Sequence, residues 1–252
     1  MTFTPKDPGI SRFNIPDLEE MTTLLAEDTF SSDLIFLGGD LAPATLLNGY
    51  RSGIFPMPVD DNQIGWFCPQ KRGVFLLYGE NDKQSPMKIS RSLRKSLQKF
   101  SYSIDLAFEQ VITGCANPAR PGGWITPQIQ EAYSELFRLG WAHSIEAWTI
   151  EGNCRVLAGG LYGISFGGLF AGESMFHSRT DGSKAALYAL ISQMAKSGGL
   201  LIDAQWQTAH LQSLGAIELP RLDYLDLLKQ ALDMPLPNFF KLGPRDLDQP
   251  TA

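Results

Sequence analysis

The segments GGLYGISFGGLFAGESMF, residues 159–176, and LLIDAQ, residues 200–205, decide the fold of this chain. Both are rich in the apolar and aromatic residues of buried β-strands, and SFGG supplies a turn inside the first segment. Between them, residues from about 183 to 197 have the composition of an apolar helix. A strand, a helix and a second strand in this order predict a crossover connection that places both strands in one sheet.

The neighbouring segments extend this sheet and surround it with helices. Residues 143–150 and 155–164 read as two further strands joined by a Gly-Asn turn, and helices are expected at about 16–27, 41–52, 90–100, 106–116, 127–139, 208–215 and 223–232. We expect Asp40 and Asp105 to cap two of these helices and the proline-containing residues 54–63 to form an extended loop. The order of elements predicts an α/β (α+β) protein with an acetyltransferase-like (GNAT) mixed sheet flanked by helices.

A polar connector, GENDKQSP at residues 79–86, separates two parts of the chain. We place a domain boundary there, which gives a small N-terminal domain over residues 1–82 and a GNAT-like catalytic domain over residues 83–252. The chain of 252 residues is long enough for either arrangement to bury a core.

Two acids and an amide interrupt the apolar strands: Glu173, Asp203 and Gln205. Charged groups on a buried strand are costly unless they have a partner or a function. Asp203 and Gln205 are two residues apart, so on a strand they share one face, as do Glu173 and Met175. If the two strands are neighbours, the three polar groups converge and form a candidate catalytic site.

A plain structural explanation exists for each acid separately. Asp203 can cap the segment that follows it, and Glu173 can pair with Arg179 or Lys184. The occurrence of all three groups in apolar strands next to glycines favours a functional site instead.

A second candidate site is cationic. Arg91, Lys95 and Lys99 are spaced at i, i+4 and i+8, so a helix over residues 90–100 aligns them in one stripe. Such a stripe is often only a solvated helix face, but in an acidic chain it also suits a phosphate backbone. Trp124 lies in a loop between PGG and a helix start, where an aromatic ring can stack on a nucleic-acid base.

Composition and motifs exclude several classes of function. The net charge of −6 argues against a protein covered in cations for bulk nucleic-acid binding. The three cysteines contain no CxxC pair and the three histidines have no metal-ligand spacing, so no metal is expected. Phosphate-binding glycine loops and membrane-spanning apolar runs are absent from the sequence, and we expect a cytoplasmic protein with no cofactor and no membrane partner.

Over about residues 34–228 the chain carries these segments in order: LGGDLAPATLLNGYRSGIFP, ISRSLRKSL, WITPQIQEAY, AHSIEAW, GGLYG, GESMF, LIDAQ, TAHLQSLGA and LPR. In these segments it resembles the leucyl/phenylalanyl-tRNA–protein transferase family. The resemblance implies a cofactor-free, monomeric enzyme that moves Leu or Phe, with Met as a further candidate donor, from aminoacyl-tRNA to acceptor proteins. The acceptors carry an N-terminal Arg or Lys and are thereby marked for degradation in the N-degron pathway.

The resemblance also implies roles for individual residues. Glu173, Asp203 and Gln205 match the family's catalytic set, Arg91, Lys95 and Lys99 its tRNA-binding patch, and Trp124 a position associated with the terminal adenosine. The family's apolar pocket for the donor side chain corresponds to Leu161, Phe170, Met175, Leu187, Leu190, Met194 and Ile202. Met57, Cys68 and Ala204 depart from the family pattern, in which Trp, Ser and Cys are common at these positions.

Two alternative functions remain open at this stage. One is an acyl-CoA-dependent N-acyltransferase on the same fold, which would need a Q/R-x-x-G-x-G/A pyrophosphate loop, whereas HSRTDGSK at residues 177–184 offers a single glycine. The other is a non-catalytic RNA-binding module, which would need the basic helix but neither the two acids nor the amide.

Overall fold

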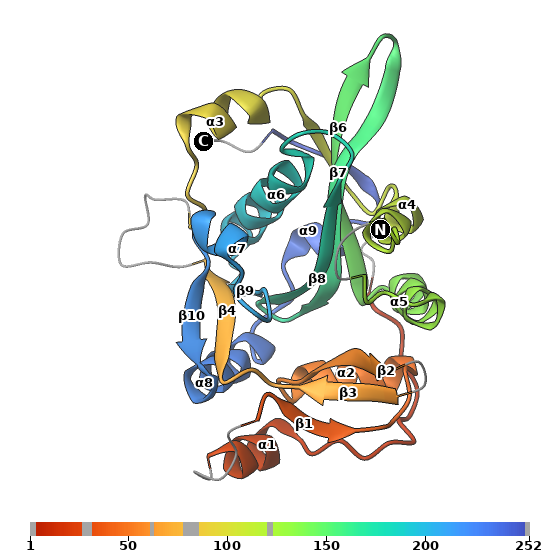
Figure 1. The fold of residues 1–252 in the computed structure, drawn as a ribbon, viewed down its shortest axis with the longest axis vertical. Coiled ribbons are helices and arrows are strands. Elements are labelled where there is room, and N and C mark those ends of the chain that lie inside the picture. The colour runs from red at the N-terminus through yellow and green to blue at the C-terminus, as the bar shows by residue number, and fades with distance from the viewer. Residues whose placement is uncertain (1–3, 27–31, 61–62, 78–85, 120–122, 250–252) are drawn as a thin grey trace.

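The computed structural model describes residues 4–26, 32–60, 63–77, 86–119 and 123–249. Its large mixed sheet has the order β10-β4-β9-β8-β7-β6-β5-β11, and a three-stranded sheet has the order β1-β3-β2 (Figure 1). The strands are β1 (Leu34–Leu37), β2 (Phe55–Asp60), β3 (Gln63–Phe67), β4 (Lys71–Leu76), β5 (Ser101–Ile104), β6 (Ala142–Glu151), β7 (Cys154–Phe166), β8 (Leu169–His177), β9 (Leu201–Asp203), β10 (Ile217–Pro220) and β11 (Arg245–Leu247).

Helices cover both faces of the large sheet, as expected for a mixed α/β fold (Figure 1). The helices are α1 (Leu18–Leu25), α2 (Pro43–Arg51), α3 (Arg91–Leu97), α4 (Phe108–Cys115), α5 (Pro127–Leu139), α6 (Gly182–Lys196), α7 (Ala209–Ser213), α8 (Arg221–Leu232) and α9 (Asn238–Lys241). One core contains buried residues of α2, α4, α5 and α8, and the other contains those of α3, α6 and α9. Along β7, Leu161 belongs to the second core and Tyr162 to the first, so the alternation of the strand supplies both.

The central crossover has the expected form. β8 and β9 pair in parallel, and α6 connects them. The hairpins β6–β7 and β7–β8 are antiparallel, so the four central strands combine both directions. Parallel neighbours need a long connection, which explains why an apolar helix lies between these two strands in the sequence.

Two predicted helix caps are wrong. The N-cap of α2 is Ala42 rather than Asp40, with Pro43 in the first turn. The N-cap of α4 is Ala107 rather than Asp105. The Asp105 carboxylate instead accepts a hydrogen bond from the Ser144 backbone nitrogen and contacts the imidazole of His143 in β6. A tertiary partner has therefore replaced the local capping interaction.

Residues 55–60 form strand β2, not the extended loop that the prolines suggested. Pro56 and Pro58 are tolerated because β2 is an edge strand of the small sheet and pairs only with β3 among the described strands. Proline lacks the backbone donor that a central strand needs on both sides.

The expected domain boundary between residues 82 and 83 lies outside the described residues, so the division into two domains stays a prediction. β4 lies on the N-terminal side of that boundary, yet it pairs with β9 and β10 in the large sheet. The N-terminal part thus supplies a strand next to the crossover. No helix in the described ranges is both long and apolar enough to cross a membrane.

Candidate active site

A β-bulge in β8 determines where Glu173 points. In the pairing with β7, Ser174 lies opposite Tyr162 and Gly172 opposite Gly163, so Glu173 is the extra residue. Opposite the bulge, a Cβ on Gly163 would lie 2.2 Å from the Ala171 carbonyl oxygen, and only glycine allows this approach. Bulges redirect side chains and are frequent beside active sites.

The bulge corrects one prediction. Glu173 was expected to share a face with Met175, but the extra residue changes the alternation between them. Glu173 contacts Tyr50 and Tyr133 on the side of the first core, whereas Met175 packs against the second core.

Gln205 is also placed differently from the prediction. β9 ends at Asp203, and Gln205 follows it with a left-handed backbone, φ 62°. Asp203 and Gln205 therefore do not share a strand face. The turn is held by the Gln205 backbone nitrogen, which donates to the Asp203 carboxylate at 2.9 Å, and by pairing of residues 204 and 205 with Gly73 of β4.

The Glu173 carboxylate is buried and accepts three hydrogen bonds. Tyr50 and Tyr133 donate through their hydroxyls at 2.7 and 3.0 Å, and the Gln205 side-chain nitrogen donates at 3.1 Å. The two hydroxyls also contact each other. Burial raises the pKa of Glu173 to about 7, although these hydrogen bonds counteract the shift. A carboxyl group with a pKa near neutrality can exchange a proton under physiological conditions.

Asp203 forms a buried ion pair with Arg72 of β4. The Arg72 Nε and Nη2 atoms each lie 2.7 Å from a carboxylate oxygen of Asp203, and both side chains are about 1% exposed. Tyr224 of α8 donates to the same carboxylate at 2.9 Å, and its ring lies 4.3 Å from the guanidinium carbon. Burial alone lowers the pKa of Arg72, but the Asp203 charge raises it above the usual value, so the guanidinium stays charged.

The three predicted catalytic groups are thus brought together through Gln205. Its side chain reaches Glu173 while its backbone is held by Asp203. Because the amide nitrogen donates to Glu173, the amide oxygen is turned away from that carboxylate and can accept from another donor. A proton acceptor and an oriented amide next to each other can position and deprotonate an amine.

An apolar cavity of about 260 Å³ adjoins these groups, where the pairing of β8 with β9 ends at Ala171 and Asp203. Glu173 and Asp203 line it, as do six of the predicted pocket residues: Leu161, Phe170, Met175, Leu187, Leu190 and Ile202. Phe75, Ala204, Thr208 and Leu211 complete much of the remaining wall. We call this the apolar cavity.

One predicted pocket residue lies elsewhere. Met194 is fully buried in the second core and does not line the apolar cavity. It was inferred from resemblance, which does not show on which side of a neighbouring element a side chain ends. Trp124, which was predicted to stack on a base and not to line the pocket, is partly buried against the first core, and its role stays a prediction.

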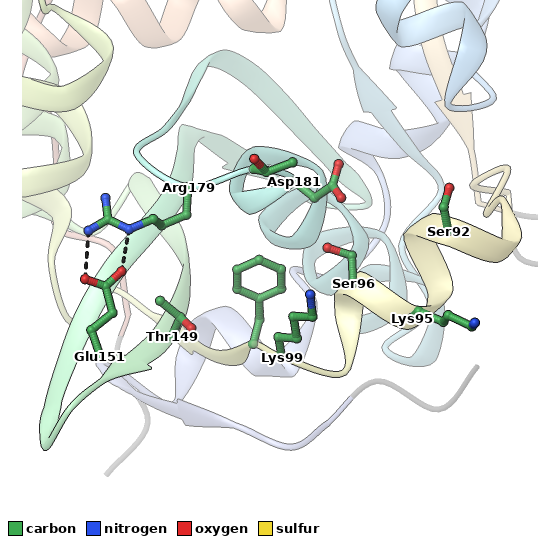
Figure 2. Close-up of a pocket in the computed structure, with 10 residues that line it drawn as sticks. Ser92, Lys95, Ser96, Lys99, Thr149, Glu151, Arg179 and Asp181 are labelled. Carbon is green, nitrogen blue, oxygen red and sulfur yellow. Dashed lines mark hydrogen bonds and ion pairs between the residues drawn. The ribbon is translucent and has the colours of Figure 1, made fainter.

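The predicted cationic residues are exposed, but only two of them are in the helix. Arg91 and Lys95 lie in α3, whereas Lys99 follows the C-cap, Gln98. None of these three cations lies within 4 Å of a carboxylate oxygen of any residue that the structure describes. Lys95 and Lys99 border a hollow between α3 and the β6–β7 hairpin, opposite the ion pair of Arg179 with Glu151 (Figure 2).

Sequence reasoning missed four residues of this site: Tyr50, Arg72, Tyr133 and Tyr224. Arg72 carried the same signal as the acids, since it is a charged residue at the start of an apolar strand. The tyrosines carried no signal, because a tyrosine on an amphipathic helix is usually an ordinary core residue. Among the described residues, no group of three or more His, Cys, Asp or Glu side chains is arranged to hold a metal ion.

Comparison with known proteins gives consistent matches along most of the chain. The family model for leucyl/phenylalanyl-tRNA protein transferase matches residues 83–229, and the model for the N-terminal domain of the same enzymes matches residues 39–70. A transferase of this name from Shewanella woodyi is 48% identical over 212 residues, which cover 82% of this chain and 85% of the relative. The transferase from Aromatoleum aromaticum is 47% identical over 192 residues, covering 75% and 76%, and that from Salmonella heidelberg is 45% identical over 219 residues, covering 86% and 88%.

Proposed function

Because this chain belongs to the leucyl/phenylalanyl-tRNA–protein transferase family and is therefore an aminoacyltransferase, we propose that it moves Leu or Phe from charged tRNA to the N-terminal Arg or Lys of acceptor proteins. The observation that carries this choice of substrates is the apolar cavity with Glu173 and Asp203 in its wall. An apolar cavity suits an aliphatic or aromatic donor side chain, and the Glu173 carboxylate beside it suits a basic acceptor.

The donor is an activated ester, so the reaction needs no nucleoside triphosphate. The α-amine of the acceptor attacks the carbonyl carbon of the ester, and a C–N bond forms. The bond from that carbon to the ribose oxygen then breaks, the oxygen takes up a proton, and the amine nitrogen loses one. Since the α-amine of a peptide ordinarily has a pKa of about 7.7–8.0, a useful fraction is neutral near pH 7.

Each polar group has a specific role in this proposal. The Gln205 amide oxygen accepts a hydrogen bond from the attacking amine and orients it. Glu173 attracts the cationic acceptor and takes part in removing the proton, consistent with its pKa of about 7. Asp203 is a positioning residue: the hydrogen bond from the Gln205 backbone supports a role in fixing the left-handed turn rather than in polarising the side-chain amide.

A direct transfer assay tests the proposed function. The protein is incubated with leucyl-tRNA and a peptide that begins with Arg, and the products are weighed by mass spectrometry. We expect a peptide heavier by one Leu residue and none from a matched peptide that begins with Glu. Failure to form that product, or its formation with leucyl-CoA and not with leucyl-tRNA, would contradict the proposal. The latter result would favour the acyl-CoA alternative.

The size of the apolar cavity should set the choice of donor. Leu187→Ala removes a side chain from its wall in α6 and leaves room for a larger donor. We expect kcat/KM for tryptophanyl-tRNA relative to leucyl-tRNA to rise about tenfold, since apolar pockets discriminate by about 1–3 kcal/mol per methylene.

Leu136→Ala in α5 is the matched control, because Leu136 is equally buried but belongs to the other core. Both variants should lose about 2–5 kcal/mol of stability. An unchanged donor ratio in Leu187→Ala would show that the cavity does not hold the donor side chain.

The exposed cations near α3 are proposed to bind the acceptor stem of the tRNA. Replacing Arg91, Lys95 and Lys99 by Glu should weaken tRNA binding. The slope of the logarithm of the binding constant against the logarithm of the salt concentration should become shallower by up to about three. Binding isotherms between low and moderate salt measure both effects.

A control variant reverses three exposed cations far away in the sequence: Arg12, Lys196 and Lys229. The net charge changes equally in both variants. Similar losses in the two variants would mean that only the overall charge matters and that α3 is not the tRNA-binding surface.

Three further features are part of the proposal. The parallel pair β8–β9, the α6 crossover and the bulge in β8 support an acetyltransferase-like catalytic unit. Action as a monomer is also part of the proposal. None of the three cysteines is in a disulfide, and Cys68 and Cys115 are buried, which is consistent with a cytoplasmic enzyme.

A further inference from the structure

A line of hollows connects the apolar cavity with α3. The first hollow, of about 440 Å³, shares Met175 with the apolar cavity and is lined also by His177, Thr180, Asp181, Ser183, Lys184 and His210. We call it the histidine hollow. A second hollow, of about 520 Å³, shares Asp181, Lys184 and His210 with it and extends to Lys88 and to Ser92 of α3. The hollow of Figure 2 shares Asp181 and Ser92 with the second one.

Three nitrogen-bearing side chains from three different elements meet at the histidine hollow. His177 ends β8, Lys184 lies in the first turn of α6, and His210 lies in α7. Asp181 is the one acid in the lining of this hollow, and it is already paired with Lys184 at 2.8 Å. The lining thus carries three nitrogen-bearing side chains and one carboxylate.

The electrostatics favour an anion in the histidine hollow. Burial lowers the pKa of His210, and charge repulsion from its neighbours in the same hollow lowers it further. An anion between like charges removes this repulsion and accepts their hydrogen bonds. The N-terminus of α6, a helix of 15 residues, contributes a partial positive charge in the same place, with Ser183 of its first turn in the wall.

We propose that the histidine hollow binds a phosphodiester of the single-stranded 3′ end of the tRNA, through His177, Lys184 and His210. The proposal rests on the proposed function, since it assumes that the donor side chain occupies the apolar cavity. The ester-bearing ribose then lies at the mouth of that cavity, and the phosphate attached to the 5′ carbon of this ribose faces the hollow that shares Met175. The remaining hollows lead the strand toward the cations near α3.

Two minimal donors separate a phosphate contact from a structural effect. One is 3′-O-phenylalanyl adenosine, which has no phosphodiester, and the other is the phenylalanyl ester of the dinucleotide CpA, which has one. The double variant His177→Ala, His210→Ala should raise KM for the dinucleotide donor roughly tenfold and that for the adenosine donor less than about twofold, because hydrogen bonds to charged groups at a partly exposed site contribute moderately. With full-length aminoacyl-tRNA, the slope of the logarithm of the binding constant against the logarithm of the salt concentration should become shallower by about one.

The controls distinguish this proposal from the proposed function. Lys196→Gln removes a cation at the opposite end of α6 and should affect neither donor. Equal losses with both donors, or no loss with either, would overturn the phosphate site while leaving the transferase function intact. A wild-type protein that uses neither minimal donor nor aminoacyl-tRNA would contradict the proposed function, on which this site depends.

Discussion

Glu173→Gln is expected to lower the rate of aminoacyl transfer by about 10²–10⁴-fold, the usual contribution of a positioned general acid or base. The substitution keeps the shape of the side chain but removes its ability to take up a proton. It also replaces one acceptor oxygen with a donor, in a site where Tyr50, Tyr133 and Gln205 all donate. Single-turnover transfer from leucyl-tRNA to an Arg-peptide measures the effect.

Binding of aminoacyl-tRNA is the control for this variant, because Glu173 and the cations Lys95 and Lys99 line different hollows. We expect the binding constant to stay within about twofold of that of the wild-type protein, a change of a few tenths of a kcal/mol. Transfer at the wild-type rate would exclude Glu173 from the proton transfer. A parallel loss of transfer and of tRNA binding would point to a structural role instead.

The same variant should differ from the wild-type protein in how its free energy of unfolding depends on pH. The pKa of Glu173 is about 7 in the folded protein and near 4.5 in its usual state, so between these values the folded protein holds a proton that the unfolded chain has released. The stabilisation is therefore complete below pH 4.5 and is lost as pH rises to about 7. Relative to Glu173→Gln, the free energy of unfolding of the wild-type protein should fall by up to roughly 3 kcal/mol across this window. Denaturation at a series of pH values measures it.

The largest effect on stability is expected from Arg72→Met. This substitution leaves the carboxylate of Asp203 buried with no guanidinium, and breaking a buried ion pair in this way costs about 3–5 kcal/mol. Transfer should also fall, because Asp203 holds the turn that presents Gln205. Chemical denaturation and the transfer assay measure the two effects on the same sample.

A double variant separates the two consequences. Arg72→Met with Asp203→Leu removes both charges, and apolar replacements of buried pairs are frequently neutral or stabilising. We expect stability to recover and transfer to stay low, because the turn at Gln205 has lost its acceptor. Arg138→Met, in an exposed ion pair, is the control and should cost less than about 1 kcal/mol. Recovery of transfer in the double variant would show that Asp203 has no positioning role.

Several features of the fold could be predicted from the sequence because they depend on neighbours along the chain. Asp17, Ser90 and Thr126 each cap the helix that follows them, through contacts with residues two or three positions along the chain. The strands at residues 142–151, 154–166 and 169–177 follow from alternation and tight turns. The predictions failed where a distant partner intervened, as at Asp105, whose carboxylate binds residues of β6 instead of its own helix.

The candidate site shows the same limit. The unusual residues in the apolar strands were identifiable because a buried charge is costly in any fold. Their directions were not, since the bulge at Glu173 and the left-handed Gln205 both break the strand alternation on which the prediction relied. Both irregularities are stabilised by other strands, namely β7 and β4.

The sequence by itself determined the crossover of two strands around an apolar helix, the identity of the two acids and the amide, and membership of a family of aminoacyl-tRNA transferases. Only the tertiary structure decided that Arg72 and three tyrosines complete the site, and that the amide reaches one acid while its backbone is held by the other. The physical reason is the separation along the sequence over which each kind of interaction acts. Apolar patterns and capping act within a few residues, whereas Asp203 and Arg72 are 131 positions apart and meet only because β9 pairs with β4.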